Sequence, residues 1–296
     1  MISLPTIRKR RKRWNLFFLA LPLMLMVLAF RYAPLFGWYL SLVDYKVGQP
    51  IFKSRFVGLY FFKMLFTSRD MSRIMRNSII LSALKTVSLV LPPVFAILLN
   101  ELNNSRFRKF AQTTTTLPHF VSWVIVYSIA YALFTSDGIV NQLLGLFGKS
   151  QKLLTNKNAV YGFQTGIWIW KNLGWKSIIY VAAIAGIDQG LYEAATVDGA
   201  NYWQKLFTIT LPLVKPSLTV ATVLNIIYVF NSFPIVWTIT KGDPANRTDT
   251  LVTYLYKLAF YNGKQGQAAA VSVIGFTILL ICASIYMYST LKKGDD

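Results

Sequence analysis

Acidic, cysteine and histidine residues are scarce in this sequence. Its 296 residues include 31 Lys and Arg, only 11 Asp and Glu, one histidine and one cysteine. A single cysteine cannot form an internal disulfide, and no His, Cys and carboxylate cluster has the spacing of a metal site. The chain also lacks a Gly-rich phosphate-binding loop, so it cannot bind ATP in the P-loop manner. We therefore predict no enzymatic activity, no catalytic residue, no cofactor and no metal site.

The composition instead indicates a membrane protein. Charged residues make up 14% and hydrophobic residues 54% of the chain, and the mean hydropathy is +0.45. A soluble domain carries about 25% charged residues, because its surface faces water. The net charge of +20 could suggest nucleic-acid binding. However, the charges lie at the ends of apolar stretches, and the densest basic run, 8–13, directly precedes the apolar span 14–30. This pattern favours contacts with membrane lipid and argues against a nucleic-acid partner.

The pattern of apolar stretches predicts an all-α membrane protein with six transmembrane helices. A spanning helix needs about 20 mostly apolar residues. No small-x-small cleavage site follows the first stretch, so we expect this helix to be retained. The domain organisation is then a basic cytoplasmic tail at 1–13, a single six-helix domain at 14–291, and a cytoplasmic tail at 292–296. The six predicted spans lie near 14–36, 78–100, 113–134, 161–186, 217–240 and 268–291.

The orientation follows from the first helix rather than from the total charge. Basic residues divide almost evenly between the segments expected inside and outside. The first helix usually dominates, and its six flanking positive charges favour a cytoplasmic N-terminus. Six spans then place the C-terminus in the cytoplasm as well.

The segment 187–216, between the fourth and fifth spans, is the most informative part of the chain. Asp188 can cap a short helix over 191–198, and Gly199 permits the positive φ that ends it. A second short helix follows, with an apolar face, and Pro212 is expected to break the chain before the fifth span. Two short helices at an angle would form a compact knob suited to docking into another protein. An ordinary amphipathic surface helix is the alternative.

The full pattern of this segment resembles the EAA loop of ABC-importer permeases. That consensus is Glu-Ala-Ala, three residues, Gly, nine residues and then Ile-x-Leu-Pro. The sequence matches every fixed position of this consensus from Glu193 to Pro212, including Ile209. One departure is Asp188-Gln-Gly, where relatives often have a proline; this should alter the turn that leads into the loop but not the docking. The resemblance implies a cytoplasmic loop that couples to an ATPase. The residues predicted to carry this coupling are Glu193, Ala194, Ala195, Asp198, Gly199, Trp203, Phe207, Leu211 and Pro212.

Further similarity extends over nearly the whole chain. The stretches 32–39, 57–59, 76–78, 117–123 and 170–175 look like the maltose-type carbohydrate permeases, and most like the branch that serves complex or polysaccharide-derived sugars. This resemblance implies a carbohydrate substrate, an oligosaccharide by preference. It also implies a homologous second permease subunit, two cytoplasmic ATPase subunits and an external solute-binding protein, assembled in the plasma membrane of a prokaryote.

Two helices offer polar and aromatic side chains that could line a substrate path. In the fourth span, four side chains share one helix face at i, i+3, i+4 and i+7. Interhelical hydrogen bonding and interfacial anchoring are the alternative roles for such residues in membranes. The candidates are Trp168, Lys171, Asn172 and Trp175 in the fourth span and Asn225, Tyr228 and Ser232 in the fifth.

The substrate class leaves alternatives open. A polar non-sugar such as glycerol phosphate is the runner-up for an ABC permease. An ion-coupled secondary carrier is a rival class, but it would need coupling carboxylates near mid-membrane, and no Asp or Glu lies mid-span here.

The excess of basic residues in the outer segments, together with Lys171, suggests an acidic oligosaccharide as a hypothesis, because a positive vestibule attracts anions. Contact of these charges with an acidic binding protein or lipid headgroups is the alternative.

Overall fold

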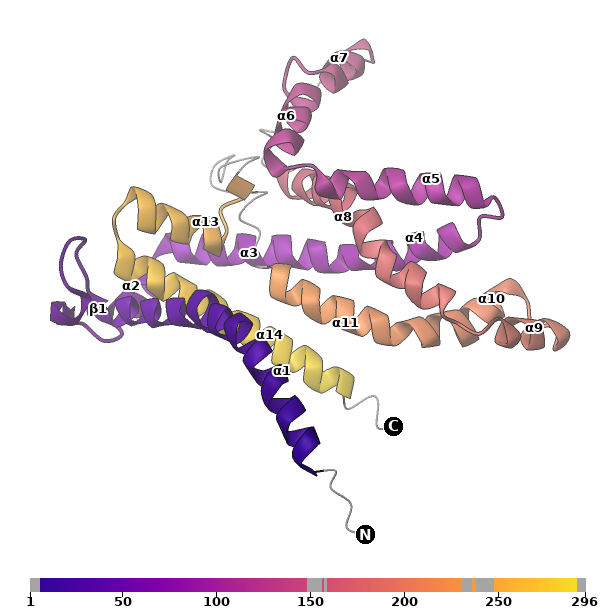
Figure 1. The fold of residues 1–296 in the computed structure, drawn as a ribbon. Helices are drawn as coiled ribbons and strands as arrows, with labels where there is room; N and C mark the ends of the chain where they lie inside the picture. The colour runs from indigo at the N-terminus through magenta and orange to yellow at the C-terminus, as the bar shows by residue number, and fades with distance from the viewer. Residues whose placement is uncertain (1–5, 148–155, 157–158, 230–235, 238–247, 292–296) are drawn as a thin grey trace, which may run out of the picture.

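A computed structural model describes residues 6–147, 156, 159–229, 236–237 and 248–291, without the side chains of 6–16, 225–229 and 290–291. The described chain is predominantly helical, and most of its long helices run along one common axis (Figure 1). The predicted helical class is therefore correct for the described residues. The two extremities of this helical body carry different elements.

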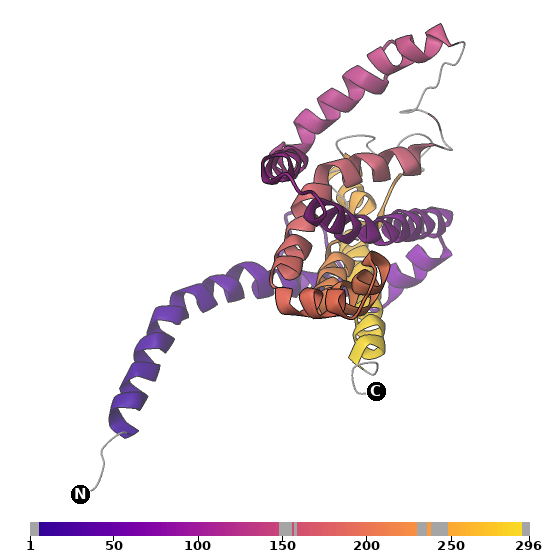
Figure 2. The same cartoon turned by 90° about the vertical axis from the view of Figure 1, so that its right-hand side faces the viewer.

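The N-terminal helix lies apart from the rest of the molecule. It runs without a break through α1 (Thr6–Val27), a π-helical turn (Leu28–Tyr32) and a 3₁₀ segment (Ala33–Leu42). The 3₁₀ segment packs against α14 (Gln265–Leu291), whereas α1 stands away from the bundle (Figure 2). In the most apolar 18-residue window of Phe17–Leu42, no residue is buried within the chain. An apolar helix of this kind requires lipid or another protein chain around it.

The segment between the first and second long helices forms a small hairpin and a short helix. Strands β1 (Val43–Asp44) and β2 (Arg55–Phe56) pair antiparallel, with Val43 opposite Phe56 and Asp44 opposite Arg55. A 3₁₀ turn (Ile51–Lys53) lies between them, and α2 (Tyr60–Thr67) follows. This small hairpin is the one departure from an all-helical architecture among the described residues.

The second long helix begins earlier than predicted. Ser68 caps α3 (Arg69–Val87) by accepting a hydrogen bond from the Met71 amide at 3.1 Å. The helix continues through a 3₁₀ turn (Ser88–Val90) into α4 (Leu91–Asn100), so it is nine residues longer at its start than the span 78–100. Pro92 and Pro93 fall in the first turn of α4, where a missing amide hydrogen is tolerated.

The predicted third span at 113–134 is wrong as a single helix. The structure has α5 (Ser105–Thr116), a 3₁₀ turn (Leu117–Phe120) and then α6 (Trp123–Phe134), which leaves α5 at a steep angle and continues into α7 (Ile139–Leu146). The break has a local cause. Pro118 cannot continue the hydrogen-bond ladder, and Ser122 starts a new helix by accepting a hydrogen bond from the Ile125 amide at 3.3 Å.

Helix α8 (Val160–Ala185) is the centre of the bundle. It packs against α3, α4, α5 and α11 (Leu211–Val229). Its contact with α5 is very close at Gly174, where an added Cβ would lie only 2.3 Å from the backbone of Thr115. Glycine is therefore required at this crossing, as at many helix contacts in membranes.

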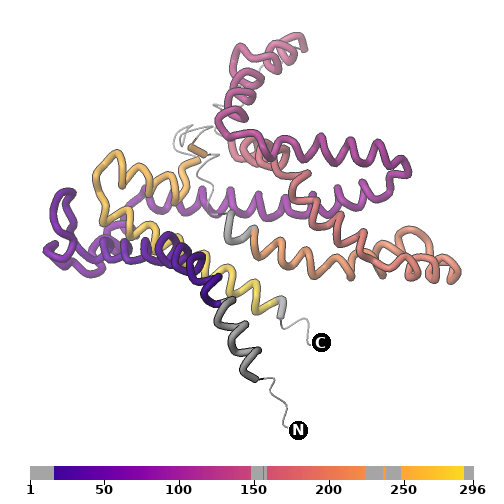
Figure 3. The backbone as a smooth tube through the Cα atoms, viewed as in Figure 1, coloured from indigo at the N-terminus to yellow at the C-terminus, as the bar shows by residue number. Residues whose placement is uncertain are grey.

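The C-terminal part closes the fold. Helix α13 (Leu251–Tyr256), a π-helical turn (Lys257–Tyr261) and α14 pack with α2 and α3 around a buried apolar cluster. A second cluster joins α4, α8 and α11. Residues far apart in the sequence thus hold the bundle together, and the backbone trace shows α3, α11 and α14 side by side (Figure 3).

Five helical stretches of the described chain are long and apolar enough to cross a membrane. Helix α8 is also long enough, since 26 residues span about 39 Å, but its lysines and asparagine lower its apolar character. The hairpin, α2 and α13 gather at one extremity of the bundle, and the turn after α4 and the 187–216 segment gather at the other (Figure 1). The five apolar stretches are Phe17–Leu42, Arg69–Asn100, Trp123–Leu146, Tyr202–Leu224 and Gln265–Ser289.

Candidate functional site: the 187–216 segment and the polar face of α8

The 187–216 segment forms two short helices joined by a glycine turn. Asp188 caps α9 (Gln189–Val197) by accepting a hydrogen bond from the Gly190 amide at 2.9 Å. Gly199 has a φ of 77°, a conformation that few other residues adopt without strain. Asn201 and Gln204 then form a reciprocal capping box at the start of α10 (Tyr202–Lys205). The local geometry predicted for Asp188 and Gly199 is therefore correct.

The two short helices are tied to each other and to the bundle. Tyr192 and Thr210 share a hydrogen bond of 2.7 Å between their hydroxyls, and the Lys205 ammonium donates to the Thr196 hydroxyl at 2.7 Å. Tyr192 and Ile209 also pack against the buried cluster formed by α4, α8 and α11. The segment is consequently an ordered extension of the bundle rather than a loose loop.

The expectation that Pro212 breaks the chain is wrong. The chain stays helical from Tyr202 to Val229, because a π-helical turn (Leu206–Thr210) links α10 directly to α11. Pro212 occupies the first turn of α11, and the wider turn before it accommodates the missing amide hydrogen. The second short helix and the following long helix therefore form one continuous rod.

The segment presents an exposed surface at the extremity of the bundle. Trp203 and Phe207 are 63% and 61% exposed, and their rings stack with centroids 6.3 Å apart. Val197, which the sequence analysis did not single out, is 88% exposed on the neighbouring helix. Exposed apolar side chains of this size grouped on one feature are typical of a surface that contacts another protein. The remaining predicted coupling residues Glu193, Ala194, Asp198, Gly199, Leu211 and Pro212 are exposed as well, and Ala195 is half-buried.

A cleft of about 220 Å³ separates this segment from the end of α4. It is lined by Asn100 and Glu101 on one side and by Tyr192, Tyr202 and Lys205 on the other. Polar groups from both sides thus face the same space. The short helices pack on the bundle through Tyr192 and Ile209, and the cleft lies beside this contact.

The predicted polar face of α8 has two different environments. Lys171 is buried, and its ammonium donates to the carbonyls of Pro118 at 2.9 Å, His119 at 2.7 Å and Val121. Trp175 stacks on the imidazole of His119 with ring centroids 4.6 Å apart. Lys171 and Trp175 therefore hold the turn between α5 and α6. This placement matches the interhelical alternative for Lys171. The ammonium provides a hydrogen-bond donor for the His119 and Val121 carbonyls at the helix break, and it adds to the Val121 amide that already donates to the Pro118 carbonyl.

The rest of the face turns toward α3. Asn172 donates to the Trp168 carbonyl of its own helix at 2.8 Å. The Trp168 ring lies near two ammonium groups, those of Lys176 at 4.5 Å and Lys85 at 6.0 Å from the ring centroid. The sequence analysis did not single out Lys85 or Lys176, because their shared proximity to one indole depends on tertiary packing. Asn225 and Tyr228 lie on α11 with side chains outside the described part of the structure, and Ser232 lies outside the described residues.

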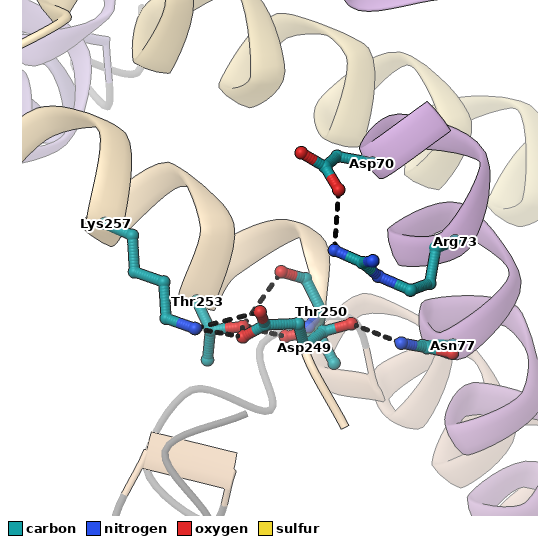
Figure 4. A network of polar contacts seen from close by, with 7 residues as sticks. All are labelled: Asp70, Arg73, Asn77, Asp249, Thr250, Thr253 and Lys257. Atoms are coloured by element: carbon teal, nitrogen blue, oxygen red, sulfur yellow. Dashed lines mark hydrogen bonds and ion pairs between the residues drawn. The ribbon is translucent and has the colours of Figure 1, made fainter. Parts of the chain in front are cut away.

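The opposite extremity carries a buried polar network that sequence reasoning missed (Figure 4). The Asp249 carboxylate accepts hydrogen bonds from the Lys257 ammonium at 2.8 and 2.9 Å, and Asn77 on α3 donates to the Asp249 carbonyl at 3.1 Å. The Tyr161 hydroxyl on α8 donates to the Asn77 side chain at 2.8 Å. One asparagine therefore joins α3, α8 and the segment before α13. No local sequence signal could indicate this, since Asn77 and Asp249 are 172 residues apart.

Comparison with known proteins identifies the family. Residues 12–291 match the family of binding-protein-dependent transport system inner membrane components, and the chain belongs to it. The chain is 33% identical over 288 residues, 95% of its length and 89% of the relative's, to the polygalacturonan/rhamnogalacturonan transport system permease protein YteP of Bacillus subtilis. It is thus a subunit of a membrane transport system.

Two solved structures have the same fold. One is a bacterial ABC transporter involved in the import of the acidic polysaccharide alginate, with a TM-score of 0.87 and 28% identity over 96% of this chain and 98% of that one. The other is the bacterial alginate ABC transporter in complex with an alginate pentasaccharide-bound periplasmic protein, with a TM-score of 0.86 and 28% identity over 96% of each chain. The fold of the described chain is therefore that of an ABC-importer permease subunit.

Proposed function

We propose that this chain is the permease subunit of an ABC importer that moves a carbohydrate across the plasma membrane of a prokaryote, driven by separate ATPase subunits. The observation that carries the proposal is the 187–216 segment, an ordered pair of short helices with an exposed Trp203–Phe207 stack at one extremity of the bundle. Its match to the EAA pattern supports a role in docking to an ATPase. Closure of two ATPase subunits on ATP would move these helices and thereby shift the bundle between two states.

The carbohydrate assignment is supported by the names of the relatives. YteP is described as a permease for polygalacturonan and rhamnogalacturonan, and the structural neighbours belong to an importer of alginate. All of these cargoes are saccharides, which favours an oligosaccharide over glycerol phosphate for this chain. The membership of the family also favours ATP-driven transport over an ion-coupled carrier.

The proposed architecture has six membrane passes and both termini in the cytoplasm. Six passes of one domain over 14–291, between short cytoplasmic tails, would be formed by the first helix, α3 with α4, α5 with α6, α8, α11 and α14. The gathering of the 187–216 segment and the turn after α4 at one extremity supports a common cytoplasmic side for them. The hairpin, α2 and α13 would then face outward.

The proposed partners follow from exposed surfaces and from the neighbours. The unburied apolar α1 supports a second, homologous permease subunit that would pack beside it in the membrane. The neighbour captured with a periplasmic solute-binding protein supports such a partner at the outer side. Two ATPase subunits would bind at the 187–216 segment and at its counterpart on the second permease.

The docking role can be tested by changing Trp203 to Ala in the complete reconstituted transporter. Trp203 is exposed, so its loss should leave folding intact, whereas removal of a central aromatic contact typically costs an interface about 2 kcal/mol or more. We expect ATP-driven uptake and substrate-stimulated ATP hydrolysis to fall together. Tyr288→Ala is the matched control, because Tyr288 is 70% exposed near the end of α14 and lies outside the 187–216 segment. Full uptake by a stable Trp203→Ala complex would refute the docking role.

A further inference from the structure

The cleft between the end of α4 and the 187–216 segment combines apolar and polar side chains. Its apolar part is formed by Ile97, Ile184 and Leu206, of which Ile184 is only 3% exposed. Its polar part brings together amide, carboxylate, hydroxyl and ammonium groups from both sides. Ligand sites in proteins have this composition, because apolar surface provides contact area while a few polar groups fix the orientation of the ligand. The polar lining residues include Asn100, Glu101, Gln189, Tyr192, Tyr202 and Lys205.

The charges that line the cleft balance each other. Glu101 and Lys205 are the charged residues of its lining, one from each side. The Glu101 carboxylate interacts with the Tyr202 hydroxyl across the cleft, and the Lys205 ammonium gives one of its hydrogen bonds to the Thr196 hydroxyl at 2.7 Å. A phosphate would lie close to the Glu101 carboxylate, and such a contact between like charges is unfavourable. A neutral ligand with several hydroxyl groups suits the cleft better, because each hydroxyl can both donate and accept.

The size of the cleft fits a single sugar ring. Its volume of about 220 Å³ is below the range of about 300–1,000 Å³ that is usual for pockets of drug-sized ligands. A pyranose has apolar C–H groups on its ring faces and hydroxyl groups around its edge, which matches the division of the lining into apolar and polar parts. The Tyr192 side chain is held at the cleft by its hydrogen bond of 2.7 Å with Thr210. Its aromatic ring therefore adds a fixed surface for a sugar face.

The cleft is separate from the surface proposed to dock an ATPase. Trp203 and Phe207 stack on each other, and neither lines the cleft, whereas their neighbours Tyr202 and Leu206 do. Adjacent residues of a helix point in directions about 100° apart, since one turn contains 3.6 residues. The docking stack and the cleft thus use different sides of α10 and the turn that follows it. A ligand in the cleft would leave the stack free to contact an ATPase.

We propose that this cleft binds a neutral sugar ring of the imported saccharide from the cytoplasm, and that the bound sugar slows the transporter. This inference rests on the proposed function as a carbohydrate permease and adds regulation by the product. One side of the site belongs to α4, and the other belongs to the segment that the ATPase subunits would move. A sugar that contacts both sides stabilises their present arrangement, which each ATP-driven cycle would have to disrupt. Import would then slow as the saccharide accumulates in the cytoplasm.

The test measures ATP hydrolysis by the complete transporter in lipid nanodiscs, where added sugar reaches the cytoplasmic face. The probes are galactose and rhamnose, two neutral pyranoses, each varied through the millimolar range. A ring of about twelve non-hydrogen atoms with ordinary ligand efficiency has a Kd of about 1–10 mM. We expect at least one of the two sugars to lower the rate of hydrolysis, by about twofold when half of the sites are occupied.

Two substitutions on the α4 side locate the effect without altering the 187–216 segment. Glu101→Ala should raise the sugar concentration for half-inhibition by about tenfold, because a hydrogen bond to a charged group is lost, and Asn100→Ala should raise it by about fivefold. Asn103→Ala is the matched control, since Asn103 is an exposed asparagine of the turn after α4 that does not line the cleft. Each variant is compared with its own rate without sugar, so that a changed basal rate does not imitate changed binding.

Inhibition that persists unchanged in both Glu101→Ala and Asn100→Ala would assign the sugar to the transport pathway and overturn the cleft site. Hydrolysis that neither galactose nor rhamnose slows would overturn it as well. Both results leave the carbohydrate function intact. That function would fail separately, if the reconstituted transporter imported a solute other than a saccharide with ATP and imported no saccharide.

Discussion

At the scale of single residues, the surroundings of Lys171 determine which groups its ammonium binds. Its position on the polar face of α8 is compatible with substrate contact, but the break after α5 places three carbonyls around its ammonium. Backbone carbonyls without partners are costly in a membrane. The donors of Lys171 remove this cost, and the cation is buried as a consequence.

Replacement of Lys171 by Met should destabilise the protein. Methionine avoids the cost of burying a charge, but it removes the ammonium donor from the His119 and Val121 carbonyls, at about 1–3 kcal/mol for each group left unsatisfied. We expect a lower midpoint in thermal unfolding of the purified protein in detergent. Lys63→Met provides the control, because Lys63 is exposed on α2 and should change stability by less than about 0.5 kcal/mol. An unchanged midpoint for Lys171→Met would contradict the structural role.

At the scale of elements, the contact of α5 with α8 positions both the helix break and the polar face. The close approach at Gly174 brings α8 against Thr115, directly before the turn whose carbonyls meet Lys171. Ser177, one turn further on, is fully buried and donates to the Gly174 carbonyl at 2.7 Å. The path of α6 away from the bundle therefore depends on one small residue.

Gly174→Ala should weaken this contact although alanine favours helix formation. The new Cβ would lie 2.3 Å from the Thr115 backbone, and the helices would have to separate, at a cost of about 1–3 kcal/mol for overpacking. Gly162→Ala on the same helix is the control, because it meets no atom within 4 Å and should gain up to about 1 kcal/mol from helix propensity. Thermal unfolding of both variants would measure the difference. A Gly174→Ala protein as stable as Gly162→Ala would show that the helices can separate without cost.

At the scale of the whole molecule, the bundle separates two kinds of surface. The 187–216 segment lies at one extremity, and the ion pair between buried Asp249 and half-buried Lys257 holds α13 at the other (Figure 4). The polar network around Asn77 links the segment before α13 to α3 and α8.

The proposed orientation predicts opposite labelling of the two extremities. In a Cys282→Ala background, a cysteine at Asn201 should react with an impermeant maleimide only from the cytoplasmic side of membrane vesicles. A cysteine at Asn262 should react only from the outer side. Both positions are exposed in the structure, so accessibility should depend on the membrane alone. The reverse pattern would invert the topology, which the evenly distributed basic residues do not determine.

Local patterns in the sequence were sufficient to predict the helical class, the capping of α9 by Asp188 and the positive φ of Gly199. These features depend on apolar runs and on residues a few positions apart. The match of 193–212 to the EAA loop pattern also indicated an importer permease from the sequence alone. The break within 113–134 has local causes in Pro118 and Ser122. The use of Lys171 to hold the turn after α5 was decided by tertiary structure. Lys171 meets carbonyls 50 to 53 residues away, and Asn77 meets a carbonyl 172 residues away. Contacts across such separations are set by how helices pack, because no periodicity in a local stretch specifies which distant backbone will lie opposite a side chain.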